Sequence, residues 1–217
     1  RFSIISSELF DDIPGSPIAY WTSDNVRKIF KESTNLGEVV EPRLGMATAN
    51  NDLFLKMWFE LSNEKINFNA KSRVDALNSK KKWFPYSKGG DYRKWYGNNE
   101  YLVNWEEDGY EIRNYKNEKG KVRSHNYNLD YIFRESITWS ALSTGPFSSR
   151  YNKPGFLFDN SGSSMFGEPE LLKIVQALLS TKLSDYLFPL INPTMNVQPG
   201  TIANFPYKEL TTNKETI

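Results

Sequence analysis

Apolar residues recur three and four positions apart over residues 171–187, near the carboxyl end of the chain. This spacing places them on one face of an α-helix, and Pro169 stands where the first helical turn would begin. The pattern predicts one long amphipathic helix over residues 169–188, ended by Pro189, with its apolar face in the core. Binding of a partner or cofactor by this stripe is the less favoured interpretation.

Two shorter helices are predicted earlier in the chain. Ser23 is a typical N-cap residue, and the apolar residues after it recur at helical spacing, which predicts a short helix ending near Lys31. Residues 74–77 predict a second short helix. Residues 113–130 are polar and contain few core-forming side chains, so we expect an exposed, mobile insertion there.

Strand-like patterns occupy the middle of the chain, as continuous apolar runs or as alternation of apolar and polar residues. The predicted strands span residues 53–59, 100–105, 110–112, 131–140, 147–151 and 156–159. Turn residues at 106–109 and at 152–155 predict two hairpins. The run at 53–59 is also compatible with a short helix.

These elements together predict an α+β fold. We expect a twisted, mostly antiparallel sheet from about residue 40 to residue 160, with the long C-terminal helix packed on it and the short N-terminal helix alongside. No run of about 18 apolar residues occurs, so no transmembrane helix is predicted and the protein is expected in the cytoplasm.

The composition excludes several classes of chemistry. The chain has no cysteine, which excludes disulfides, cysteine nucleophiles and thiolate zinc sites. Its single histidine, His125, lies in a polar stretch and is interpreted as a solvated side chain. Glu168, Glu170 and Lys173 fit a helix start better than a nuclease metal site. The chain begins without a methionine or a signal peptide, so we expect a fragment of a longer protein.

Charge is distributed in blocks, although the net charge is only +1. Residues 71–94 carry eight Lys/Arg and two Asp/Glu, and residues 113–153 carry eight and three. The segment between them, residues 95–112, carries five acidic residues and no Lys or Arg. If the two basic blocks fold onto one face, they form an electrostatic footprint for nucleic acid.

Aromatic residues alternate with cations over residues 80–96, and Gly89 and Gly90 interrupt this stretch. Cations can contact phosphates, and flat rings can pack on sugars or on unstacked bases. The pattern therefore favours a basic aromatic loop that binds nucleic acid. The alternative is that the rings belong to core strands and the lysines to a solvated face.

Several blocks resemble the target-recognition region of single-chain adenine-specific DNA methyltransferases of the TaqI-like and type IIG kinds. Residues 45–54, GMATANNDLF, resemble the motif G-[IM]-x-T-G-x-N-x-x-F that opens this region. Similar blocks follow in order, at residues 82–96, 137–140, 155–159, 178–182 and 202–206. Among these enzymes, the amino-acid sequence is closest to the methyltransferases of BREX and phage-growth-limitation defence systems. Ala49 departs from the usual glycine, and a positive φ there would cost alanine about 1 kcal/mol.

The resemblance implies that this chain is the specificity portion of such an enzyme. The F-x-G-x-G loop for S-adenosylmethionine and the N/D-P-P-Y/F loop for a flipped adenine do not occur in the sequence. We therefore expect no enzyme activity and no cofactor in this fragment, and S-adenosylmethionine in the parent enzyme. Residues 1–35 would be a linker or an edge of the catalytic domain, and residues 36–217 a DNA target-recognition domain.

By the same resemblance, double-stranded DNA and the catalytic domain of the same polypeptide are the expected partners, with other defence-system proteins as further ones. Candidates for phosphate contacts are Lys80, Lys81, Lys82, Lys88, Arg93, Lys94, Arg113, Lys121, Arg123, Arg150 and Lys153. Candidates for base readout are Arg93, Asn98, Asn99, Arg134, Ser140 and Arg150.

Two other functions remain open from the sequence. The aromatic content of 15% would suit a module that binds carbohydrate or protein, which predicts dependence on the rings and little dependence on salt. The chain could also be an interaction domain for other defence-system proteins, with DNA read elsewhere.

Overall fold

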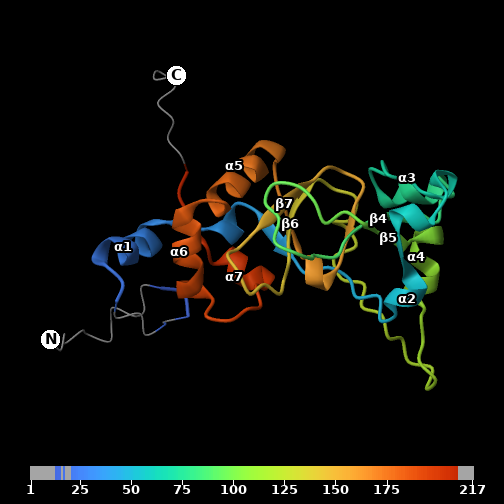
Figure 1. The fold of residues 1–217 in the computed structure, drawn as a ribbon, viewed down its shortest axis with the longest axis horizontal. Coiled ribbons are helices and arrows are strands. Elements are labelled where there is room, and N and C mark those ends of the chain that lie inside the picture. Colours follow the sequence, from blue (N-terminus) through green and yellow to red (C-terminus); the bar gives the residue numbers. More distant parts are fainter. Residues whose placement is uncertain (1–12, 16, 18–20, 210–217) are drawn as a thin grey trace.

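The computed structural model describes residues 13–15, 17 and 21–209. The molecule is elongated, with a helix-rich lobe at one end and a second lobe, containing α2, α3 and α4, at the other (Figure 1). Each lobe is built around a four-stranded sheet. The chain is therefore a mixture of helices and mainly antiparallel strands, as predicted, but it has two main sheets instead of one.

The first sheet has the order β2-β9-β6-β7 and is antiparallel throughout. Its strands are β2 (Glu41–Arg43), β9 (Ser164–Phe166), β6 (Ser136–Trp139) and β7 (Ser149–Asn152). The helices of this lobe are α1 (Asp24–Glu32), α5 (Pro169–Leu179), α6 (Lys182–Ile191) and α7 (Pro199–Ala203). A short pair, β1 (Thr34–Asn35) with β10 (Pro206–Tyr207), completes this lobe.

The predicted N-terminal helix is confirmed as α1, with Ser23 as its N-cap, and its apolar residues pack against the core of the first lobe. The single long C-terminal helix is wrong, because α5 and α6 are separate helices. The break falls at Ser180 and Thr181, where the Thr181 side chain accepts a hydrogen bond from the Ser184 amide at 3.2 Å and caps a new helix. Pro189 lies inside α6 and does not end it.

The second sheet has the order β3-β5-β4-β8. Its strands are β3 (Leu55–Met57), β5 (Tyr101–Asn104), β4 (Trp83–Ser87) and β8 (Leu157–Phe158). Only the β4–β8 pair is parallel. The helices of this lobe are α2 (Asn51–Phe54), α3 (Arg73–Asn78) and α4 (Glu106–Arg113), and α3 confirms the short helix predicted at residues 74–77.

Neither predicted hairpin forms. The return strand at residues 110–112 belongs to α4 instead, because β3 and β4 already occupy both edges of β5. The strands predicted around residues 152–155 belong to different sheets, since β7 pairs with β6 and β8 pairs with β4. The strand at 53–59 is reduced to β3, between α2 and a short 3-10 turn.

Strand β9 joins the two cores. Met165 packs in the core of the first lobe, and the next residue, Phe166, packs in the core of the second. Consecutive strand residues point to opposite faces, so one short strand can serve both cores. Within residues 13–15, 17 and 21–209, no helix is long and apolar enough to cross a membrane.

Candidate nucleic-acid interface

The basic aromatic stretch divides into two parts with different environments. Trp83, Phe84 and Tyr86 lie in β4 and are buried, so the core interpretation holds for them and they offer no ring to a nucleic acid. The later rings are exposed: Tyr92 and Trp95 at 54% each, and Tyr96 at 73%.

The exposed rings belong to residues 89–98, which run along the edge of the first sheet. The Trp95 amide donates to the Ser149 carbonyl at 3.0 Å, and the Trp95 carbonyl accepts from the Tyr151 amide at 2.9 Å. Lys94 Nζ donates to the Ser180 carbonyl at 3.0 Å, so this cation is engaged by the end of α5. The segment is thus held against β7 by backbone and side-chain contacts.

The lysine run at residues 80–82 meets the acidic segment rather than solvent alone. Lys82 Nζ lies 3.0 Å from Glu106 and 3.4 Å from Glu111. The hydrogen bond from Lys82 to Glu106 outweighs burial and raises the pKa of Lys82. Lys81 Nζ donates to the Glu64 carbonyl, whereas Lys80 is exposed. Part of the positive charge that the sequence offers is therefore paired with carboxylates at the surface of the second lobe.

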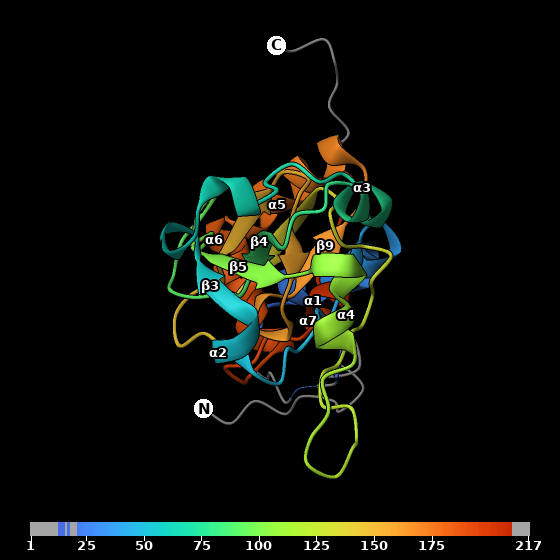
Figure 2. The same cartoon turned by 90° about the vertical axis from the view of Figure 1, so that its right-hand side faces the viewer.

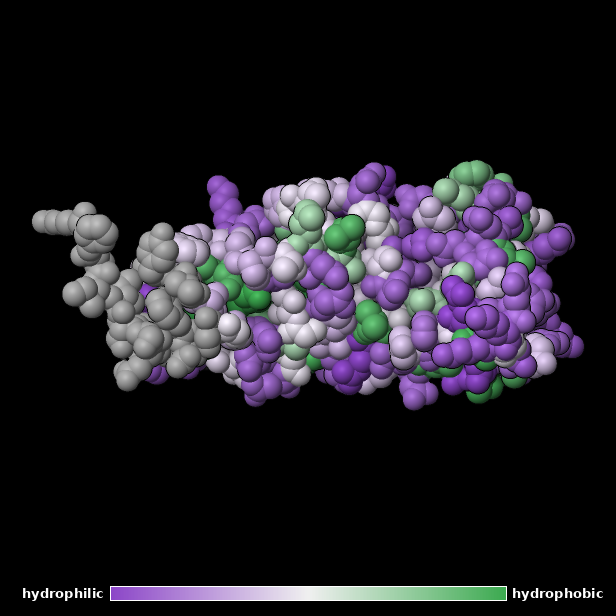
Figure 3. All heavy atoms as spheres, turned by 90° about the horizontal axis from the view of Figure 1, so that it is seen from below, coloured by the Kyte–Doolittle hydropathy of each residue, from purple (hydrophilic) through white to green (hydrophobic). Residues whose placement is uncertain are grey.

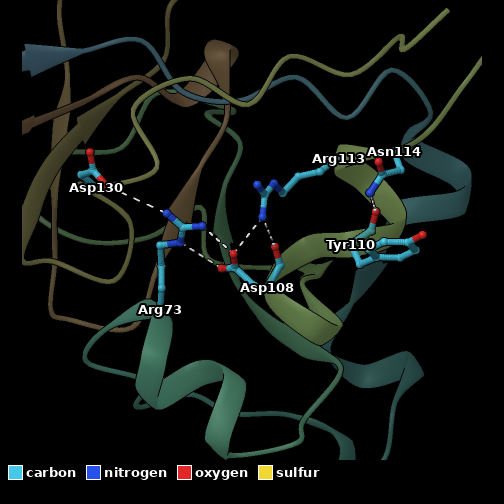
Figure 4. A network of polar contacts seen from close by, with 6 residues as sticks. All are labelled: Arg73, Asp108, Tyr110, Arg113, Asn114 and Asp130. Carbon is cyan, nitrogen blue, oxygen red and sulfur yellow. Dashed lines mark hydrogen bonds and ion pairs between the residues drawn. The ribbon is translucent and has the colours of Figure 1, made fainter.

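Arg113 is also held by an acidic side chain. Arg73 and Arg113 converge on the carboxylate of Asp108, with Arg113 Nη1 at 2.8 Å and Arg73 Nε at 2.9 Å (Figure 4). Burial opposes ionisation of Asp108, but the hydrogen bond from Arg73 and the charges of both arginines lower its pKa. This network ties α3 to α4, and Asp130 adds a longer contact to Arg73 at 3.9 Å.

Three of the six candidates for base readout are buried. Asn98 is buried and donates to the Asp91 carbonyl at 2.9 Å, and Ser140 donates to the Gly90 carbonyl at 2.8 Å. Arg150 is fully buried; burial and the nearby Arg93 lower its pKa to about 10. In the free chain these three side chains are therefore buried within residues 89–98 or next to them.

The remaining candidates for base readout, and Lys153, belong to different segments of the chain. Arg134 is exposed and stands over the Tyr131 ring at 5.1 Å, and Asn99 is half-buried. Arg93 is exposed and lies 3.7 Å from Glu100. Lys153 is exposed in the connection between β7 and β8. The predicted cations are thus distributed over several parts of the molecule rather than gathered by their order in the sequence.

The motif loop, residues 45–52, connects β2 of the first sheet to α2 of the second lobe. A Cβ atom on Gly45 would stand 2.5 Å from the carbonyl carbon of Asp159, so only glycine fits there. The Met46 amide donates to the Phe158 carbonyl at 2.9 Å, and the Asn160 amide donates to the Met46 carbonyl at 2.9 Å. Ala49 has a φ of +63°, which confirms that the position usually held by glycine requires the left-handed region.

Polar groups line an open pocket of about 290 Å³ beside the motif loop. Its lining includes Thr48, Asn51, Lys88, Asn160 and Ser161, with Asp159 at its buried side. We name these six residues, with the motif loop, the motif pocket. The pocket presents hydroxyl and amide groups of the kind that hydrogen-bond to polar ligands.

The Asp159 carboxylate, at the buried side of the motif pocket, is held in place by several contacts. It accepts hydrogen bonds from the Tyr86 hydroxyl at 2.7 Å and the Ser161 amide at 2.8 Å, and Lys88 Nζ lies 3.5 Å away. Burial, with the charge of Asp159, raises the pKa of Tyr86 well above its ordinary value. The predicted contact residue Lys88 is therefore positioned by a buried carboxylate that the sequence did not reveal.

Lys121 and Arg123 lie in a hairpin-like projection that we name the finger, residues 115–123. It extends away from the second lobe, below α4 (Figure 2). The face that carries the finger is mainly hydrophilic over this lobe, with scattered hydrophobic residues (Figure 3). Lys116 and Lys119, which the sequence analysis did not single out, are exposed in the same projection. The described residues contain no group of three or more side chains suited to hold a metal ion.

Two curated relatives match most of the chain. It is 44% identical over 200 residues to the adenine-specific methyltransferase PglX of Lacticaseibacillus casei (strain Zhang), which covers 91% of this chain and 16% of the relative. It is 39% identical over 200 residues to the adenine-specific methyltransferase BrxX of Escherichia coli O9:H4 (strain HS), covering 91% of this chain and 15% of the relative. No protein family model matches the chain.

The chain is therefore homologous to a segment of these methyltransferases and spans about one sixth of their length. The resemblance to methyltransferases of the BREX and phage-growth-limitation kind is confirmed.

Proposed function

We propose that this chain is the DNA-recognition portion of an adenine-specific DNA methyltransferase of a bacterial phage-defence system. The proposal is carried by the match of nearly the whole chain to a small part of two adenine-specific methyltransferases. The sequence lacks both the S-adenosylmethionine loop and the N-P-P-Y type loop. Such an enzyme needs both of them to transfer a methyl group to a flipped adenine.

In this proposal, the work is divided between two parts of one polypeptide in the cytoplasm. The parent enzyme binds S-adenosylmethionine and receives the flipped adenine in its catalytic domain. Residues 36–217 read the DNA, and residues 1–35 connect them to that domain. The chain itself supplies binding energy and sequence preference and carries no catalytic group.

The motif pocket is the part of the surface that we propose for base readout. Asn51 and Asn160 offer amide groups that can pair with base edges, and Lys88 offers a cation beside them. The exposed Arg134 and the half-buried Asn99 stay candidates, whereas Asn98, Ser140 and Arg150 act by supporting residues 89–98. The exposed candidates for phosphate contacts are Lys80, Arg93, Arg113, Lys121, Arg123 and Lys153. Arg93 and Arg113 already lie beside the carboxylates of Glu100 and Asp108.

Binding of this chain to duplex DNA is expected to weaken steeply with salt. Each phosphate contact contributes about 0.9 to the slope of log affinity against log salt concentration, because it releases condensed counterions. Fluorescence anisotropy of labelled mixed-sequence duplex, titrated from about 25 to about 200 mM salt, measures this slope.

The matched variant for this experiment removes the three exposed rings, Tyr92→Ser, Trp95→Ser and Tyr96→Ser. We expect it to keep the slope of the wild-type chain, since rings do not release counterions. Absence of DNA binding at the lowest salt would contradict the proposal. Salt-independent binding of a carbohydrate or protein that is lost in this variant would favour a binding module instead.

A further inference from the structure

The finger is an ordered projection and not an irregular loop. Its two sides are joined by a bridge between Lys116 and Val122. The Asn117 amide donates to the Lys121 carbonyl at 2.9 Å, and the Gly120 amide donates to the Asn117 carbonyl at 2.8 Å. The Asn117 side chain accepts from the amides of Lys119 and Lys121 at 3.0 and 2.9 Å. Gly120 has a φ of +72°, which closes the turn.

The base of the finger is attached to the motif loop. The Ala47 amide donates to the His125 carbonyl at 2.7 Å, and the His125 amide donates back at 3.0 Å. Tyr115 receives a hydrogen bond from the Asn50 side chain at 3.1 Å, and its ring meets Phe54 edge-on at 5.2 Å. The finger is therefore joined to the same loop that borders the motif pocket.

The charge of the finger is available to a ligand. Four of its residues are exposed cations, Lys116, Lys119, Lys121 and Arg123, and Glu118 is its only acidic residue. Within the described part of the chain, the side chains of these four cations make no hydrogen bond or ion pair. They differ in this from Lys82 and Arg113, whose charges are paired with carboxylates.

We propose that the finger enters the major groove of duplex DNA and that its four cations contact the phosphates on either side of it. This inference rests on the proposed function. A two-stranded ribbon has the width that the major groove of B-DNA admits. Phosphate contacts fix the register of a protein on the duplex without reading sequence, so the finger positions the motif pocket against the bases.

The test is a comparison of two variants of the 217-residue chain with equal changes in net charge. The finger variant carries Lys116→Ser, Lys119→Ser, Lys121→Ser and Arg123→Ser. The control variant carries Lys65→Ser, Lys71→Ser, Lys182→Ser and Lys208→Ser, four cations exposed outside the finger. Both variants are titrated onto duplex DNA across the same salt range, and thermal unfolding verifies that both are folded.

The finger variant is expected to lose about 3.6 from the salt slope, which is about 0.9 for each of four contacts. Between about 50 and 200 mM salt, this equals about a 10²-fold smaller fall in affinity than for the wild-type chain. The control variant should stay within about one unit of the wild-type slope.

Three results would overturn the inference on the finger. Equal slopes for the finger and control variants would show that the finger does not contact DNA. Loss of folding in the finger variant would show that its cations are structural. Tighter binding of the wild-type chain to an RNA duplex of the same sequence, titrated in parallel, would assign the finger another ligand. A wild-type chain that does not bind DNA at all would instead remove the proposed function.

Discussion

Gly45→Ala is expected to destabilise the chain by about 3 kcal/mol, near the upper end of the range for overpacked sites. The added Cβ would meet backbone atoms of Phe158 and Asp159, including the Asp159 carbonyl carbon at 2.5 Å. Those atoms are fixed by the hydrogen bonds that join Met46 to Phe158 and Asn160. The strain would therefore separate the motif loop from β8, and the motif pocket would be lost with it.

Urea unfolding measures this effect, and Gly145→Ala is the matched control. Gly145 lies in an exposed turn, and nothing stands within 4 Å of a Cβ built there. The Gly145→Ala control should have the same urea midpoint of unfolding as the wild-type chain. An unchanged midpoint for Gly45→Ala would mean that the close contact between the motif loop and β8 does not exist.

Asp108→Asn is expected to cost about 2 kcal/mol, because charge-assisted hydrogen bonds from two arginines are lost at a partly buried site. Asparagine tolerates the φ of +55° at this position, so the backbone conformation is kept. Arg73 and Arg113 would remain side by side without the carboxylate that holds them (Figure 4). The contact between α3 and α4 should weaken as a result.

The effect of Asp108→Asn should depend on pH in a defined direction. The pKa of Asp108 is lowered in the folded chain, so its stabilisation is complete above the ordinary value of 3.8 and is lost as the pH falls through the lowered value. Urea unfolding at neutral pH and well below pH 3.8 measures the free energy of unfolding of the Asp108→Asn variant and of the wild-type chain. The difference between these two free energies should become smaller at low pH. Glu107→Gln removes the same charge at an exposed neighbour and should change little. An equal loss of stability in Asp108→Asn and Glu107→Gln would contradict a stabilising role for the contacts of Asp108 with Arg73 and Arg113.

Local signals in the sequence identify elements more reliably than they identify their partners. Ser23 and the apolar spacing after it are sufficient to predict α1, because both capping and amphipathicity act within one helix. The break between α5 and α6 depends on Thr181, whose capping role competes with continued helical spacing. Strand β8 pairs in parallel with β4, some 70 residues away in the chain, and nothing in its own residues indicates that pairing.

In the candidate interface, the pairing of charges likewise depends on the fold and cannot be predicted from local sequence. The sequence places Lys82 in a basic block and Glu106 in an acidic one, but only the fold brings these two residues within 3.0 Å. The aromatic residues of β4 and those of residues 92–96 are indistinguishable by type, and burial alone separates them. The turn signal of Asn117 and Gly120 was available in the sequence and indicates the finger, although its anchoring to Ala47 was not.

The most direct test of DNA recognition by this chain is the identity of the methylated sequence in hybrid enzymes. The chain would replace the matching 200 residues in PglX of Lacticaseibacillus casei and, separately, in BrxX of Escherichia coli. Sequencing that detects N6-methyladenine in the host DNA then gives the site of each hybrid. If the inserted chain reads the DNA, both hybrids methylate one and the same sequence. Hybrids that each keep the sequence of their own framework would contradict it.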